Sequence, residues 1–111
     1  MDFDAIRARA LEVRRLYAAF EQQQHGRSWS AQELAVGFVG DVGDLAKLVL
    51  AKSGVRSIDD ANEKLAHELA DCLWSVIVLA DAYGVDLEKS FVETMDRLEG
   101  WLEGRLERGR T

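Results

Sequence analysis

The chain has 111 residues, 48% of them hydrophobic and 31% charged, and it carries a formal net charge of −6. This length and composition predict one domain over residues 1–111 with a hydrophobic core, while the acidic balance excludes the basic surface that nucleic-acid binding normally requires. A single cysteine excludes an internal disulfide. We find neither a secretory signal nor a run of ~20 apolar residues, so we expect a cytoplasmic protein without a membrane partner.

Two helices are predicted in the first half of the chain, where no segment alternates between apolar and polar residues as a strand would. The first is expected over about residues 3–24, because apolar residues recur there every three or four positions, and Gly26 should end it. The second should begin after Ser30, since a serine N-cap with Glu33 three residues later is the capping-box pattern. It is expected to end near Lys52.

Two further helices are predicted in the second half. The third is expected over about residues 58–83, with Ser57 as a possible cap and Gly84 at its end. Asp86 should cap the fourth, over about residues 87–104, and the last residues should form a frayed tail. Four apolar residues of the fourth helix should face a core: Phe91, Met95, Leu98 and Leu102. The predicted fold is therefore all-α, with the second and third helices antiparallel.

The second helix contains the most apolar segment of the chain, LAVGFVGDVGDLAKLVL at residues 34–50. Its only polar side chains are Asp41, Asp44 and Lys47. The two acids lie about 60° apart around a helix, so they share one face in the middle of an apolar stripe. A solvated charged face does not have this pattern.

The third helix repeats the spacing with Glu68 and Asp71, which border an apolar face. If the two apolar faces pack together, four carboxylates converge, and like charges in a poorly solvated place need protons, cations or a metal. Oxygen ligands favour Mg²⁺, with Mn²⁺ as the second possibility. The structural alternative is that the acids of the second helix cap or hydrogen-bond a partner helix in an oligomer interface.

The strings GDVGDLAKLVLAKSG and EKLAHELADCLWSVIVLADAYGVDL give the chain a specific resemblance to the MazG-like all-α nucleoside triphosphate pyrophosphohydrolases. The likeness spans about residues 28–98, and the family pattern is E-x-x-E on one helix and E-x-x-D on the next. The resemblance implies a four-helix bundle that assembles as a homodimer or homotetramer. It also implies hydrolysis of a nucleoside triphosphate to the monophosphate and pyrophosphate, in housecleaning of the nucleotide pool.

The resemblance also assigns the site residues. Asp41 and Asp44 stand where the family has its first two glutamates, and Glu68 and Asp71 match the second pair. In the family, these four residues are catalytic and bind the Mg²⁺ ions that hold the triphosphate. We therefore expect them to be both the metal ligands and the catalytic residues here, with Mg²⁺ as cofactor and Mn²⁺ as the possible substitute.

The chain departs from the family pattern at several positions. The first pair is Asp rather than Glu, so each side chain is one methylene shorter, which closer helix packing would offset. Glycines that would permit such packing are Gly37, Gly40 and Gly43. Gly40 replaces a glutamate of many members, and Thr94 and Leu98 replace a lysine and an asparagine. The alternative function is a catalytically degenerate helical module that binds a nucleotide or a partner protein.

Four residues are candidate substrate contacts: Trp29, Lys47, Lys64 and Arg97. Trp29 precedes the second helix and would stack on a base or pack the loop. The lysines, with Lys52 and Arg56, flank the acids and would meet phosphates or remain solvated. By helical angle we expect Trp74 to lie away from the acids, and we assign no metal role to His67.

Overall fold

The structure of the protein is a computed structural model that describes residues 1–54 and 57–110, so Arg56 lies outside the described part. Within it the chain forms four helices and no strand: α1 (Phe3–His25), α2 (Ala31–Lys52), α3 (Ala61–Ala82) and α4 (Leu87–Arg108). The all-α prediction is confirmed.

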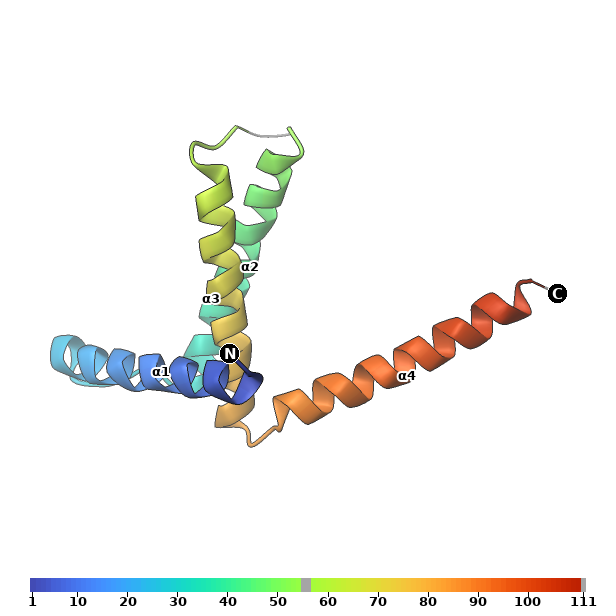
Figure 1. Ribbon diagram of the computed structural model, residues 1–111. Coiled ribbons are helices and arrows are strands. Elements are labelled where there is room, and N and C mark those ends of the chain that lie inside the picture. The colour runs from blue at the N-terminus through green and yellow to red at the C-terminus, as the bar shows by residue number, and fades with distance from the viewer. Residues whose placement is uncertain (55–56, 111) are drawn as a thin grey trace.

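The helices α2 and α3 form an antiparallel pair, and α1 crosses the end of this pair where α3 finishes (Figure 1). The last helix, α4, extends away from the other three (Figure 1). The radius of gyration is 18.2 Å, whereas a compact domain of this length has a value of about 13 Å. A single chain therefore does not close a four-helix bundle on its own, although it contains the four helices that such a bundle needs.

The core of the single chain is small and is spread over α1, α2 and α3. Its buried apolar residues are Ala10, Leu48, Ile77 and Val78. The expectation that α4 faces a core is wrong within one chain, because none of the described residues of this helix is buried. Its four apolar residues are exposed by 39–61%: Phe91, Met95, Leu98 and Leu102.

Three predicted helix ends are confirmed by their hydrogen bonds. Gly26 ends α1 with a φ of 74°, a left-handed conformation that glycine adopts without strain. Ser30 and Glu33 form the expected capping box at the start of α2. The side chain of Asp86 accepts a hydrogen bond from the Lys89 N–H and so caps α4.

Two predicted helix ends are wrong. Ser57 does not cap α3, which begins at Ala61 after Asp60, a residue with a φ of 56° and no side-chain capping bond. The helix α4 does not fray at residue 104 but continues to Arg108, since the charged residues of its last turns are good helix formers. The end of α4 lies at Gly109, whose N–H donates to the Arg105 carbonyl, and not at Gly104.

The predicted role of the α2 glycines, which is to permit close packing of α2 on α3, is not observed within a single chain. A Cβ atom added at any of Gly37, Gly40 or Gly43 would meet no atom of the described residues within 4 Å. These glycines therefore do not bring α2 closer to α3. Among the described residues, no helix is both long and apolar enough to cross a membrane.

Candidate metal centre

Three of the four predicted acids meet between α2 and α3. One carboxylate oxygen from each of Asp41, Asp44 and Glu68 lies within 4.8 Å of the others. Asp41 and Glu68 are half-buried, whereas Asp44 is exposed, so the α2 pair lies at the edge of the apolar stripe rather than beneath it. Helical spacing aligns the α2 acids, and the packing of α2 on α3 places them opposite Glu68.

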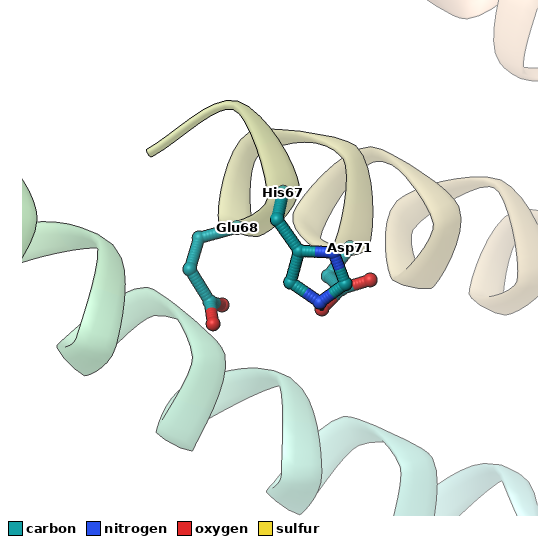
Figure 2. Close-up of side chains that lie close together, drawn as sticks. All are labelled: His67, Glu68 and Asp71. Carbon is teal, nitrogen blue, oxygen red and sulfur yellow. The ribbon is translucent and has the colours of Figure 1, made fainter. Parts of the chain in front are cut away.

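Asp71 belongs to a second group on α3 that shares Glu68. Ligand atoms of His67, Glu68 and Asp71 also lie within 4.8 Å of one another. Figure 2 shows the Glu68 carboxylate pointing toward α2, with Asp71 and the His67 imidazole beside it. His67 Nε2 is 3.0 Å from Asp71 Oδ2. Sequence analysis assigned His67 no metal role, whereas the structure places Asp71 beside it as a second potential ligand in addition to Glu68. The four-residue spacing between His67 and Asp71 is the sequence signal for this contact.

Glu68 is the electrostatic centre of both groups. Burial raises the pKa of its carboxyl group above the ordinary value, and the nearby carboxylates of Asp71, Asp41 and Asp44 raise it further. Its Oε2 atom is buried and has no hydrogen-bond partner. A buried carboxylate oxygen without a partner is costly, and a bound cation would supply the missing interaction.

The donor set fits a divalent cation. Ligands of one ion with bonds of about 2.1 Å lie about 3–4 Å apart, so carboxylate oxygens within 4.8 Å need only small side-chain rotations to close on it. Asp41, Asp44, Glu68 and Asp71 would hold Mg²⁺ or Mn²⁺, which prefer oxygen ligands. The unpartnered oxygen of Glu68 distinguishes this cluster from ordinary exposed acids.

An aromatic cleft of about 640 Å³ adjoins the acids. Asp41 lines it together with Trp29, Phe38 and Trp74. A neighbouring cleft of about 500 Å³ contains the same two tryptophans, Asp41 and Asp71. Apolar clefts with a few convergent polar groups are the common form of small-molecule sites. The acids therefore lie at the edge of a surface that fits a flat, partly apolar ligand.

The helix α1 determines the position of Trp74. The indole Nε1–H of Trp74 donates to the carbonyl of Ala10 at 3.0 Å, and its ring contacts Tyr17 with the ring centroids 5.6 Å apart. The helical angle that places Trp74 away from the acids also predicts a core contact, which these contacts with α1 confirm. The same side chain nevertheless lines both clefts with Asp41. Helical angle alone misses this, since it does not include the packing of α1.

The helix α1 also anchors Trp29. Glu21, a buried acid, accepts a hydrogen bond from the Trp29 N–H at 2.8 Å, and Arg14 donates to the Trp29 carbonyl at 2.6 Å. The Arg27 guanidinium lies 5.0 Å from the centre of the indole ring. Sequence analysis did not identify Glu21 or Arg14 as supports of the cleft, because their role depends on contacts with the loop before α2.

The predicted cationic contacts differ in position. Lys47 and Lys64 line a cleft of about 400 Å³ together with Asp44 and Glu68. By contrast, the structure does not bring Arg97 to the acids, because α4 extends away from them (Figure 1) and the Arg97 guanidinium contacts Thr94 at 3.5 Å instead. Two of the three cations named as candidate substrate contacts, Lys47 and Lys64, therefore lie beside the acidic group within one chain.

Comparison with known proteins gives one match. The family model of the MazG nucleotide pyrophosphohydrolase domain matches residues 31–101, more than half of the chain. No curated protein and no solved structure matches. The matched range begins at α2 and includes every acid of the candidate metal centre, whereas it leaves out α1, the helix that positions both tryptophans.

Proposed function

Because the chain belongs to the MazG nucleotide pyrophosphohydrolase family, we propose that it hydrolyses a nucleoside triphosphate in the presence of Mg²⁺ or Mn²⁺. The products are the nucleoside monophosphate and pyrophosphate, as expected of a housecleaning enzyme for ribo- or deoxyribonucleotides. The observation that carries the proposal is the buried, unpartnered Oε2 of Glu68 among the carboxylates of Asp41, Asp44 and Asp71.

The four acids would hold the divalent cation in this proposal. A bound cation neutralises phosphate oxygens and the charge that develops on them during transfer. A carboxylate that is not fully used as a ligand accepts the proton of the attacking water. The oxygen of this water forms a bond to phosphorus as the phosphoanhydride bond between the α- and β-phosphates breaks, and pyrophosphate leaves. The net charge of −6 opposes the approach of a triphosphate, and a bound cation would reduce this repulsion.

The clefts beside the acids contain candidate contacts for the phosphates and for the base of the proposed substrate. Lys47 and Lys64 line the cleft beside Asp44 and are the candidate phosphate contacts. Trp29 and Trp74 line the aromatic cleft beside Asp41 and are the candidate contacts for the base. Stacking of a base on an aromatic side chain contributes roughly 1–3 kcal/mol.

The proposal includes assembly as a homodimer or a dimer of dimers. The apolar side chains on α4 repeat at intervals of three and four residues, so they form one stripe along the helix. Helices in proteins gain most of their stability from the packing of an amphipathic face, and a second copy of the chain would cover the stripe. In the same assembly, helices of two copies would complete a four-helix bundle. Arg97 of α4 would then lie near a candidate metal centre.

The test is a panel of ribo- and deoxyribonucleoside triphosphates incubated with the purified protein and Mg²⁺ or Mn²⁺. Release of pyrophosphate that requires the metal supports the proposal. Asp71→Asn should reduce the release by at least about a hundredfold, since it removes a ligand charge, while Asp4→Asn on the exposed first turn of α1 should not. Unchanged turnover in the Asp71 variant would reject the assigned site.

The same panel tests the second candidate, a helical module that binds a nucleotide or partner protein without turnover. That candidate is favoured by the shortened acids Asp41 and Asp44 and by the glycine at position 40. Nucleotide binding seen by calorimetry, with no pyrophosphate from any member of the panel, would establish binding and exclude hydrolysis of those nucleotides.

A further inference from the structure

The imidazole of His67 lies at the edge of the acidic group but belongs to neither acidic pair. Its Nε2 atom is 3.0 Å from Asp71 Oδ2, and its ligand atom is within 4.8 Å of those of Asp71 and Glu68. The side chain is 72% exposed, so burial does not force it into this position. Its contact with Asp71 therefore reflects the geometry of α3 itself.

The sequence spacing of this group is one that metal-binding helices use. Residues four apart lie on the same face of a helix, one turn above the other. In the H-E-x-x-H helices of zinc enzymes, ligands at the first and fifth positions bind one ion for this reason. Here H-E-L-A-D places His67 and Asp71 at those two positions, with Glu68 between them on the side that faces α2 (Figure 2).

The measured separation also fits two ligands of one ion. Two donors at right angles, each bonded at about 2.1 Å, are about 3.0 Å apart. His67 Nε2 and Asp71 Oδ2 have this separation without any rearrangement. The buried Oε2 of Glu68, which has no hydrogen-bond partner, is the third donor available to the same ion.

We propose that His67 is a nitrogen ligand of the divalent cation, together with Glu68 and Asp71, and that it makes the centre prefer Mn²⁺ or Co²⁺ over Mg²⁺. The inference rests on the proposed function only in taking these acids as metal ligands. A neutral imidazole offers a lone pair at Nε2, and imidazole raises the affinity for transition metals while Mg²⁺ prefers oxygen. Glu68 belongs both to this group, which offers one nitrogen and two oxygen ligands, and to the group with Asp41 and Asp44, which offers oxygen ligands alone.

The test detects the metal–nitrogen bond rather than activity. The full-length protein is loaded with Mn²⁺, and electron spin-echo envelope modulation is recorded for coupling to ¹⁴N. We expect the coupling in the wild type and in His25→Gln, and its loss in His67→Gln. Because His25 is the only other histidine, it is a matched control. Glutamine preserves a hydrogen-bond donor toward Asp71 but offers no imidazole lone pair.

Metal affinities measured by calorimetry give the second readout. His67→Gln should weaken Mn²⁺ and Co²⁺ binding by at least about tenfold and change Mg²⁺ binding by less than about twofold. Absence of ¹⁴N coupling in the wild type would overturn the proposal, and so would coupling that persists in the variant. Equal losses for Mg²⁺ and Mn²⁺ would show that His67 only positions Asp71. Metal-dependent pyrophosphate release in any of these cases would leave the proposed function standing.

Discussion

The side chains of Asp41 and Glu68 come from different helices, yet a carboxylate oxygen of one lies within 4.8 Å of a carboxylate oxygen of the other. The packing of α2 on α3 places these like charges close together. Their mutual repulsion, and the burial of Glu68, work against folding unless a cation is bound. The free energy of unfolding should therefore rise when a divalent metal is added, and substitution of a metal ligand should reduce that increase.

Glu68→Gln should have opposite effects with and without metal. In metal-free buffer at neutral pH, the substitution should raise the free energy of unfolding by about 1 kcal/mol, because it removes a charge whose Oε2 has no partner. The sign follows from the raised pKa of Glu68, since a folded state that disfavours the carboxylate is destabilised wherever that group is ionised. With millimolar Mg²⁺, the wild type should gain stability and the variant should gain much less.

Urea unfolding with and without Mg²⁺ measures this pair of effects. Glu103→Gln, an exposed position on α4, is the control and should respond to metal as the wild type does. If metal stabilises wild type and Glu68→Gln equally, Glu68 does not bind it.

Trp74→Phe should loosen α1 from α3. The variant keeps an aromatic ring against Tyr17 but loses the hydrogen bond from the indole to the Ala10 carbonyl. We expect a loss of about 1 kcal/mol in the free energy of unfolding, measured by urea titration. Tyr83→Phe, at a position 63% exposed, should change the value by less than about 0.5 kcal/mol. A Trp74 variant as stable as the wild type would show that the bond is not formed in solution.

Leu98→Asp should dissociate the proposed homodimer. The side chain lies in the middle of the α4 stripe and is 48% exposed within one chain, so a charge there would be buried without a partner in the assembly. Sedimentation equilibrium should give a dimer or tetramer for the wild type and a smaller species for the variant. Glu93→Gln, on the opposite side of the helix, should leave the mass unchanged. A monomeric wild type would contradict the proposed assembly.

Glu33 should remain ionised at unusually low pH. Two hydrogen bonds from the Arg27 guanidinium, and one from the Ser30 N–H, lower its pKa from 4.5 to about 2. Because the folded pKa is depressed, the stabilisation by this carboxylate is fully present above pH 4.5 and is lost as the pH falls through about 2. The ¹³C shift of the Glu33 carboxyl group should thus change little down to about pH 3.5, where an ordinary glutamate is largely protonated.

Arg27→Gln tests the cause of that shift. Removing the guanidinium should return the Glu33 titration toward its ordinary range, while Arg15→Gln, which removes the partner of Glu12, should leave Glu33 unchanged. A Glu33 midpoint that is the same in all three proteins would show that the ion pair does not form in solution.

The sequence by itself determined the features that arise from local interactions. Helix periods, the Gly26 end and the Ser30 capping box depend on residues within one or two turns, so their patterns were sufficient. The same holds for the two acidic pairs, because three-residue spacing places both carboxylates of a pair on one face before any packing occurs. The resemblance to the MazG-like family rested on these local strings and is confirmed by the family match.

Only the tertiary structure decided which of these faces meet and which remain free. The placement of Trp74 beside Asp41 and the supporting contacts of Glu21 both require α1 to cross the α2–α3 pair. The helix α4 extends away from the other three described helices (Figure 1), so its apolar residues stay exposed although they recur at intervals of three and four. Hydrophobic periodicity identifies a face that can be buried, but the burial itself is a contact between distant segments, whose relative placement no local pattern contains.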